Sequence, residues 1–307
     1  MKAQTLLFIA EITCKKEMAK LLIMFGAEVN LKVSVEGGTF MYHCIRAADD
    51  YLVQRNIKKG EDVNRTVIQN RTALFVASWF GHTSVVLLLL ENGAAASLNN
   101  GDCNKSPLMI AANKGHIFVV EVLIKFGAEL GFYGLTTPFH CAARRGHTAL
   151  CSYLLDQGID PNVCEVGGGT SLYLAAKNGH AEVVSLLLSR KADVAVFGDE
   201  NKRSPLFIAA KGGHVEIVLL LLQYGSDINQ RINEAGTGAV TPLYTAAKNN
   251  FKSVVEVLLV AGADVNFPSR RPPDLLTAAS NSPFESRGTW SPGTTVHSSC
   301  IGGLAWG

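Results

Sequence analysis

The chain has 307 residues, of which 48% are hydrophobic and 18% are charged, and its formal net charge at pH 7 is +2. This composition excludes an intrinsically disordered chain, because disordered chains carry far fewer apolar side chains. The small net charge excludes polyanion binding that is driven by overall charge alone, so electrostatic arguments depend on where the charges lie. The seven cysteines form no CxxC pair, which indicates free thiols in a reducing compartment.

The apolar runs of the chain do not match membrane or secretory signals. The run in the first ten residues is interrupted by Glu11, and no small-residue cleavage site follows it, so it does not fit a signal peptide. The run over residues 85–90 is too short to span a bilayer. We therefore expect a cytoplasmic protein, with a nuclear location as the alternative, and no membrane insertion.

A seven-residue segment recurs along most of the chain. With residues 241–247 (TPLYTAA) as the probe, related segments begin near residues 5, 39, 72, 106, 137, 170 and 204. Consecutive segments are 31 to 37 residues apart. A repeat of this length is the signature of a solenoid, in which each unit buries its apolar face against its neighbours.

Each unit carries the signals of two short helices. In the sixth unit, Thr170 is a suitable N-cap, and Leu172 and Ala175 lie three residues apart on one helical face. Gly179 can adopt a positive φ and end this helix. The apolar residues within 183–188 then predict a second helix, and most units close with a second glycine.

Residues at fixed positions in each unit form a recognisable motif. Its clearest examples are Ser106-Pro107-Leu108, Ala111-Ala112 and Gly115-His116, and the segment GADVN over 262–266 closes the last full unit. This motif resembles the ankyrin repeat. The resemblance implies an all-α solenoid of stacked helix-turn-helix repeats with projecting β-hairpin loops. We expect about eight repeats in an ankyrin repeat domain over residues 1–266, a truncated ninth repeat over 267–282 and a disordered tail over 283–307.

Several units depart from the motif. In the second unit, Cys44-Ile45 replaces Ala-Ala and Ala48-Asp49 replaces Gly-His, so this unit is degenerate. Lys191 and Asn250 stand at positions where other units have glycine, which predicts left-handed backbone at both. The shortest spacing predicts a clipped hairpin near 131–136, and the longest predicts a longer finger over 233–240.

Five of the eight histidines occupy one repeat position. They are His82, His116, His147, His180 and His214. Because a buried imidazole needs hydrogen-bond partners, we interpret them as structural groups that link backbone to the opening Thr or Ser of a repeat.

Other polar clusters do not match known catalytic or metal-binding patterns. His140, Cys141, His147 and Cys151 lack the standard spacings of zinc ligands. The glycines at 167–169 lack the lysine of a phosphate-binding loop and predict a tight turn. We therefore expect a protein that is not an enzyme, with no metal, no cofactor and no catalytic residues.

The two positions after each Ala-Ala pair are the candidate binding positions. The resemblance places them on the concave face of the array, and seven of them are basic while none is acidic. Trp79 and Phe80 form an aromatic pair for which the repeat offers no packing role, and exposed aromatics beside arginines are typical of interface hot spots. The alternative is that these residues are only solvated. The predicted partner-binding residues are Arg46, Trp79, Phe80, Lys114, Arg144, Arg145, Lys177, Lys211 and Lys248.

These observations favour a protein–protein interaction scaffold. We expect a monomer whose concave groove binds another protein, through an acidic or extended segment of that partner. One alternative is the ankyrin part of a larger enzyme, channel or regulatory protein. Another is nucleic-acid binding through the basic groove, which is disfavoured because the chain has one aromatic pair and no nucleic-acid motif.

Overall fold

The computed structural model describes residues 18, 21, 22, 39–97, 106–130, 136–165, 167–198, 202–234 and 238–266. These residues form a row of helix pairs, each with a first and a second helix joined by a tight turn. The first helices are α3 (Phe40–Arg46), α5 (Ala73–Phe80), α7 (Pro107–Lys114), α9 (Pro138–Arg145), α11 (Ser171–Asn178), α13 (Pro205–Gly212) and α15 (Pro242–Lys248). The second helices are α4 (Asp50–Lys58), α6 (Thr83–Glu91), α8 (Ile117–Lys125), α10 (Thr148–Asp156), α12 (Ala181–Ser189), α14 (Val215–Gln223) and α16 (Lys252–Val260).

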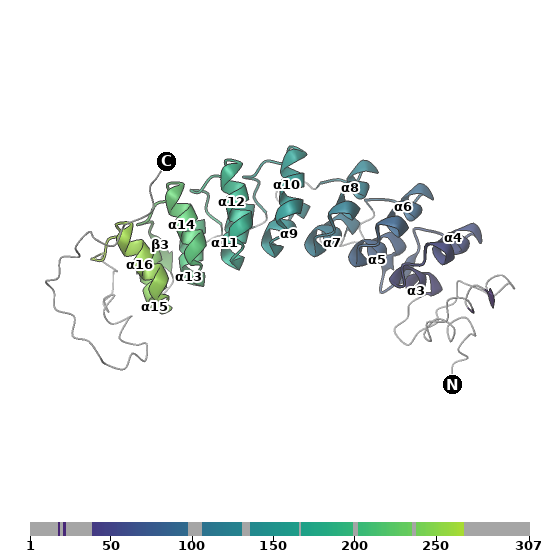
Figure 1. The fold of residues 1–307 in the computed structure, drawn as a ribbon, viewed down its shortest axis with the longest axis horizontal. Coiled ribbons are helices and arrows are strands. Elements are labelled where there is room, and N and C mark those ends of the chain that lie inside the picture. Colours follow the sequence, from purple (N-terminus) through teal and green to yellow (C-terminus); the bar gives the residue numbers. More distant parts are fainter. Residues whose placement is uncertain are drawn as a thin grey trace, which may run out of the picture.

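The pairs stack in chain order: each first helix packs against the next first helix, and the second helices pack along the runs α4–α6–α8 and α10–α12–α14–α16. Figure 1 shows a gently curved row with the first helices on its inner side and the second helices on its outer side. The expected all-α solenoid is therefore confirmed. None of the helices in the described parts of the chain is long and apolar enough to cross a membrane.

The first helices begin and end where the motif predicts. The N-cap Thr or Ser of every described pair accepts a hydrogen bond from the backbone N–H three residues later, which satisfies one of the donors that a helix leaves unpaired. Five first helices end at a glycine with φ between 75° and 80°. Lys191 and Asn250 have φ of 63° and 61°, so their predicted left-handed backbone is confirmed as well.

The hydrophobic core is continuous along the row, from Phe40 to Ala263. The Ala-Ala pairs of α7, α9, α11 and α13, such as Ala142 and Ala143, have no exposed surface. Their small side chains allow neighbouring first helices to approach closely, so the stacked faces exclude water along the array.

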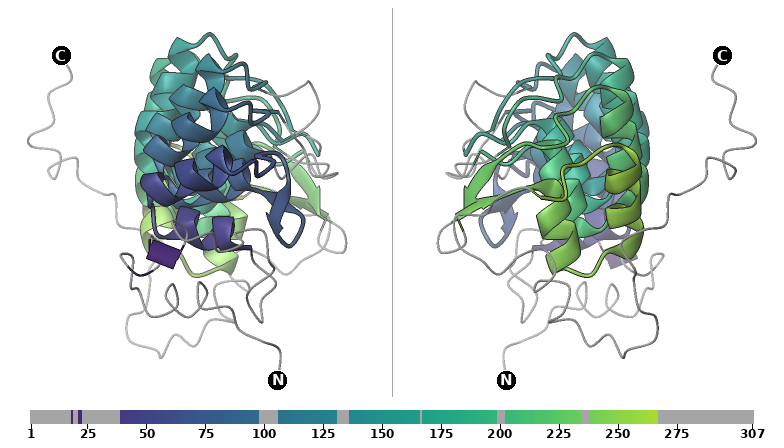
Figure 2. Two further views of the ribbon diagram at one scale, coloured as in Figure 1. Left: turned by 90° about the vertical axis from the view of Figure 1, so that its right-hand side faces the viewer. Right: turned by 90° about the vertical axis from the view of Figure 1, so that its left-hand side faces the viewer.

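Hairpin loops project from one side of the array (Figure 2). Strands β1 (Thr66–Ile68) and β2 (Arg71–Thr72) form one antiparallel hairpin, and β3 (Ile232–Glu234) and β4 (Gly238–Val240) form another. The second of these confirms the predicted longer finger. The glycine-rich loop is a tight turn, with Gly167 and Gly168 at positive φ and a bridge between Cys164 and Thr170.

The closing motif also ties neighbouring repeats together, a role that the sequence did not reveal. The side-chain oxygens of Asn64, Asn162 and Asn229 accept hydrogen bonds of 2.8–2.9 Å from backbone amides 31 to 35 residues later in the chain. These bonds fix each hairpin turn against the next one.

Parts of the predicted organisation lie outside the described residues. Only Met18, Leu21 and Leu22 of the first predicted repeat are described, as helical residues. The clipped hairpin falls mostly within the undescribed residues 131–135, and the predicted ninth repeat (267–282) and tail (283–307) lie wholly outside.

Candidate protein-binding surface

The predicted binding residues all lie in the last turns of first helices. Because these helices stand side by side on the inner side of the curve (Figure 1), the residues form a row along that side, which we call the inner surface. Trp79, Arg144 and Lys211 are half-buried, and the others are exposed. The inner surface thus consists of Arg46, Trp79, Phe80, Lys114, Arg144, Arg145, Lys177, Lys211 and Lys248.

The interpretation that Trp79 has no packing role is wrong. Its half-buried ring packs on the core and lies 6.1 Å from the ring of Phe75. Two cations flank it, with Lys114 Nζ 4.7 Å and the Arg71 guanidinium carbon 5.2 Å from the ring centroid. Cations over an indole ring are attracted to its π electrons. Trp79 is therefore held in place between neighbouring repeats, and Phe80, 37% exposed, is the freer half of the pair.

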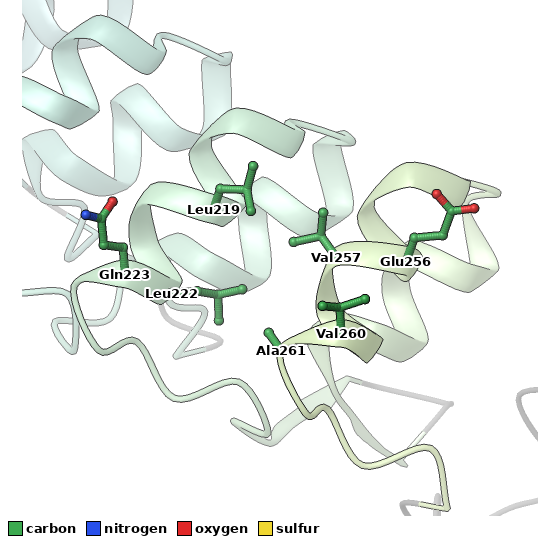
Figure 3. A pocket seen from close by; sticks show the side chains of 7 residues that line it. All are labelled: Leu219, Leu222, Gln223, Glu256, Val257, Val260 and Ala261. Atoms are coloured by element: carbon green, nitrogen blue, oxygen red, sulfur yellow. The ribbon is translucent and has the colours of Figure 1, made fainter. Parts of the chain in front are cut away.

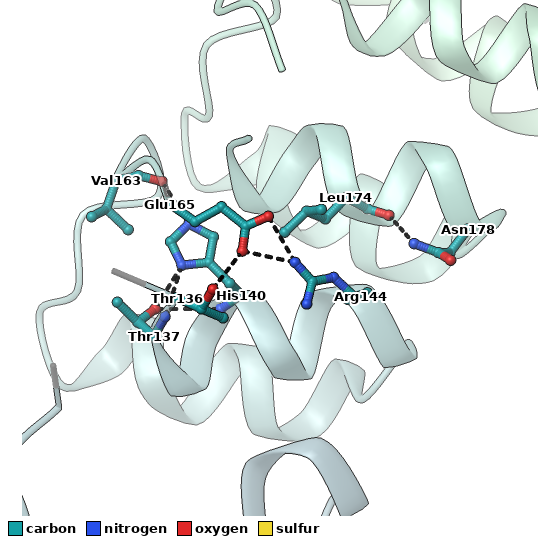
Figure 4. A network of polar contacts seen from close by, with 8 residues as sticks. All are labelled: Thr136, Thr137, His140, Arg144, Val163, Glu165, Leu174 and Asn178. Carbon is teal, nitrogen blue, oxygen red and sulfur yellow. Dashed lines mark hydrogen bonds and ion pairs between the residues drawn. The ribbon is translucent and has the colours of Figure 1, made fainter. Parts of the chain in front are cut away.

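The charge of Arg144 is neutralised by Glu165, which does not lie at one of the predicted binding positions (Figure 4). Arg144 Nη2 donates to both carboxylate oxygens of Glu165 at 2.7 Å, and the Thr136 hydroxyl donates to the same carboxylate at 2.9 Å. Glu165 lies in the loop after α10, and its side chain is 13% exposed. The ion pair therefore fastens this loop to α9 and lowers the positive charge of the inner surface.

The remaining cations differ in their partners. Arg145 Nε donates to the side-chain oxygen of Asn113 at 2.9 Å. Arg46, Lys177 and Lys248 are exposed and have no ion-pair partner among the described residues. Together with Lys114, they are the charges of the inner surface that remain available to a ligand.

A polar pocket of about 350 Å³ opens beside Arg144 and Lys177. Its floor includes the buried Tyr173, and the glycines of the 167–169 loop form part of its wall. A side chain at Gly198 would overlap the Tyr173 ring, with its Cβ only 1.8 Å from Cγ, so glycine is required for the backbone to lie against the ring. No sequence pattern indicated this pocket, because its walls come from two different repeats.

The repeated histidines hold the backbone of the inner surface. The Nε2 atoms of His116, His147 and His180 lie 3.0–3.2 Å from backbone carbonyl oxygens of the preceding repeat. For His116 and His180 those carbonyls belong to Trp79 and Arg144. Their structural role agrees with the sequence analysis, but the expected link to the opening Thr or Ser is wrong. Those hydroxyls accept from the first turn of their own helix instead.

The cysteines and histidines between residues 140 and 151 do not form a zinc site. His140 is fully buried, with Nδ1 accepting from the Thr137 N–H at 3.2 Å and Nε2 2.9 Å from the Val163 carbonyl oxygen (Figure 4). Burial lowers the pKa of His140, and it raises the pKa of the Cys151 thiol to about 12. Across the described ranges, no three His, Cys, Asp or Glu side chains form a group that could hold a metal.

A second, apolar pocket lies on the outer side between α14 and α16 (Figure 3). It has a volume of about 360 Å³ and is lined mainly by aliphatic side chains, with Gln223 and Glu256 as its polar members. Ala261 follows α16 where Tyr224 follows α14, so a smaller side chain leaves this space open. The pocket offers no set of groups for acid–base chemistry.

Comparison with known proteins agrees with the fold. The family model for ankyrin repeats (3 copies) matches residues 6–100, 41–134, 93–164, 131–198, 160–232 and 196–269. The chain belongs to the ankyrin repeat family. The solved structure of the human ASB11 ankyrin repeat domain is similar, with a TM-score of 0.64, 28% identity, and coverage of 73% of this chain and 98% of that chain.

Curated relatives share the ankyrin region with this chain. The mouse (Mus musculus) B-cell lymphoma 3 protein homolog is 28% identical over 212 residues, which cover 66% of this chain and 45% of that protein. The human (Homo sapiens) transient receptor potential cation channel subfamily A member 1 is 29% identical over 200 residues, which cover 62% and 18%. This chain thus spans less than half the length of either relative. Ankyrin repeats generally mediate protein–protein interaction, and the fold is typically a non-enzymatic scaffold.

Proposed function

We propose that this ankyrin array binds another protein through its inner surface, and that the bound segment is acidic or extended. The observation that carries the proposal is the row of exposed cations Arg46, Lys114, Lys177 and Lys248, which lack ion-pair partners among the described residues. An unneutralised row of one sign attracts a segment of the opposite sign and excludes segments of like sign.

The aromatic pair supplies an apolar anchor for the same ligand. Trp79 is held between Arg71 and Lys114, so its ring loses little rotational freedom when a partner binds. Phe80 stacks on His82 with ring centroids 5.7 Å apart and keeps 37% of its surface exposed. Pre-organised aromatic side chains beside cations are favourable sites for the strongest contacts of an interface.

The pocket beside Tyr173 supports an acidic side chain as the ligand group. Arg144 uses only Nη2 in its pair with Glu165, and its side chain is 38% exposed. A guanidinium has five N–H donors, so further donors remain for a second carboxylate. Lys177 lines the same pocket and adds a positive charge.

Charge reversal at lysines tests the proposal better than reversal at the arginines. Because Arg144 and Arg145 bond Glu165 and Asn113, their replacement also loosens the fold. We expect the full chain with Lys114→Glu and Lys177→Glu to lose more than about tenfold in affinity for a fluorescein-labelled peptide of twelve glutamates. The matched control carries Lys125→Glu and Lys191→Glu, which make the same charge change at exposed residues away from the inner surface.

The comparison between the two double variants decides the outcome. Equal binding by wild type and the Lys114/Lys177 variant would overturn the proposal. An equal loss in both variants would also overturn it, because that result reports net charge and not the inner surface. Salt-dependent retention of a single-stranded oligonucleotide in preference to the peptide would support nucleic-acid binding instead.

A second candidate is an ankyrin module within a larger protein, such as a channel or regulatory protein. The observation in its favour is that similar proteins, among them the human channel subunit, contain the matched region as a minor part of their length. Long-read sequencing of transcripts tests it: additional in-frame coding sequence supports this candidate, and transcripts confined to these 307 codons contradict it.

A further inference from the structure

One cation occupies the same helix position in each of four consecutive repeats. The residue directly after the Ala-Ala pair of α9, α11, α13 and α15 is Arg144, Lys177, Lys211 and Lys248, respectively. Each of these helices packs on the next one, and Figure 1 shows them side by side on the inner side of the curve. The four cations therefore form a row with one positive charge per repeat.

Hydrogen bonds between repeats hold the backbone at both ends of this row. The carbonyl oxygen of Arg144 lies 3.0 Å from Nε2 of His180 in the next repeat. At the other end, where Phe251 replaces the histidine, the side-chain amide of Asn249 donates to the carbonyl oxygen of Lys211 at 3.4 Å. The spacing of the charges is thus set before a ligand binds, which reduces the entropy that is lost on binding.

The spacing of the repeats selects the backbone conformation of a ligand that lies along the row. Packed helices are about 8–10 Å apart. A polyproline II helix advances about 9 Å in each turn of three residues, so every third side chain points to the same face. A β-strand presents side chains to one face about every 7 Å, which does not match. An α-helix needs seven residues to advance about 10 Å, and its face drifts by about 20° with each such step. Polyproline II is therefore the conformation that brings one side chain to each of the four cations.

An aromatic ring stands at the same helix position nearer the other end of the inner surface. Trp79 occupies on α5 the position that Arg144 occupies on α9. Its half-buried ring is flanked by Lys114, with Nζ 4.7 Å from the ring centroid. Aromatic side chains that line a groove are the surfaces on which proline-rich polyproline II segments dock. The same line of positions therefore offers contacts to proline as well as to carboxylates.

Given the function proposed above, on which this ligand rests, we propose that the segment bound by the inner surface is a polyproline II helix with an acidic residue at every third position. Successive carboxylates meet Arg144, Lys177, Lys211 and Lys248. The polar pocket of about 350 Å³ beside Arg144 and Lys177 accommodates the first two of them. Specificity then comes from the spacing of the acidic residues and not from their number alone.

Two peptides of identical composition test the spacing on the full chain. The periodic peptide is four copies of Glu-Pro-Pro, and the irregular peptide is two copies of Glu-Glu-Pro-Pro-Pro-Pro, each labelled with fluorescein. Both favour polyproline II, but the periodic peptide has all four carboxylates on one face and the irregular peptide has only two. We expect the periodic peptide to bind about tenfold more tightly in fluorescence anisotropy, because it forms two more ion pairs with the row.

A variant of the protein tests the same assignment from the other side. Lys177→Gln removes an exposed cation from within the row, so the preference for the periodic peptide should fall to about threefold. The matched control is Lys125→Gln, which removes an exposed lysine at the end of α8 and should leave the preference unchanged. An equal fall in both variants would overturn the proposal, because it would report net charge and not the row.

The peptide of twelve glutamates separates this proposal from the proposed function. If that peptide binds but the periodic and irregular peptides bind equally, the inner surface still binds acidic segments and the spacing assigned to the ligand is wrong. If none of the three peptides binds, the ligand and the proposed function are both wrong. Tighter binding of a helical peptide with four glutamates at every seventh position would overturn the proposal in favour of an α-helical ligand.

Discussion

The interior helix pairs and the degenerate pair α3–α4 adopt the same helices but are tied to their neighbours differently. At three junctions between interior pairs, a glycine at positive φ lies under a histidine of the next repeat, and that histidine (His116, His147 or His180) bonds a carbonyl of the earlier repeat. In α3–α4, Ala48 takes the left-handed position with φ of 52°, and Asp49 replaces the histidine and caps α4 by accepting from Leu52 N–H at 3.1 Å. Helix formation is thus locally encoded, whereas the ties between repeats depend on the Gly-His pair.

The loss of the Gly-His pair in α3–α4 also affects the next repeat. His82 would be the partner of α3 in the interior pattern, but its Nε2 is buried without a hydrogen-bond partner among the described residues. Such a group adds nothing to the stability of the stack, and its desolvation disfavours folding. The pair α3–α4 should therefore be the less firmly held part of the described array.

The largest expected effect comes from the interior glycine turn. Gly146→Ala places a Cβ 2.6 Å from His180 Nδ1 and requires alanine at φ of 78°. We expect a loss of about 2–3 kcal/mol in the free energy of unfolding, from backbone strain and loss of the His180 hydrogen bond. Urea denaturation followed by circular dichroism measures it. Ala48→Gly is the opposite change and should raise the free energy of unfolding by about 0.5–1 kcal/mol. A lower free energy of unfolding in this variant would contradict the comparison between the interior pairs and α3–α4.

A smaller effect is expected at the histidines. His147→Ala removes the contact of Nε2 with the Asn113 carbonyl oxygen at 3.2 Å, which should lower the free energy of unfolding by about 1–2 kcal/mol. His82→Ala removes a ring whose Nε2 has no such partner, and should have the weaker effect. The same denaturation experiment compares the two variants. If His82→Ala lowered the free energy of unfolding more than His147→Ala, the hydrogen bonds of the repeated histidines would not be what holds the repeats together.

The smallest expected effect depends on pH and lies at the degenerate end. Glu61 is 6% exposed, and burial raises its pKa from 4.5 to about 7. The folded state therefore retains a proton that the unfolded state has lost, so stability falls as pH rises from about 4.5 to 7. Glu61→Gln should flatten this dependence, by about 1.3 kcal/mol between pH 6 and pH 8. Thermal unfolding of both proteins at the two pH values measures this effect. If Tm changed between the two pH values by the same amount in wild type and in the variant, the role of Glu61 would be ruled out.

The period of the sequence predicted the helices because their start and stop signals are local. Thr137 caps α9 through a neighbour three residues away, and Gly146 ends the same helix through its own backbone freedom. Nothing about these signals depends on distant parts of the chain. This is why even α3, without its Ala-Ala pair, forms where the period places it.

The chemistry of the inner surface was less predictable because it depends on contacts between repeats. Glu165 reaches Arg144 from a loop 21 residues away, and the packing of that loop does not follow from helical periodicity. The sequence could have predicted that Lys114 lies near Trp79, because both occupy the last turn of neighbouring first helices. The contact between the ammonium group and the ring depends on side-chain rotamers and could not be predicted. The sequence therefore predicted the row of cations. It did not predict which of these cations are already neutralised by partners within the chain.

The most direct test of the inner surface as the binding face is site-specific photo-crosslinking. Phe80 lies on the inner surface, and Phe118 on α8 is a matched control that is more exposed, at 67% against 37%. Replacing either residue in the full chain by p-benzoylphenylalanine places the same reactive group on the two sides of the array. The account predicts that a partner protein is crosslinked from position 80 and not from position 118, and that an excess of the glutamate peptide suppresses the product. Crosslinking from position 118 alone would contradict it.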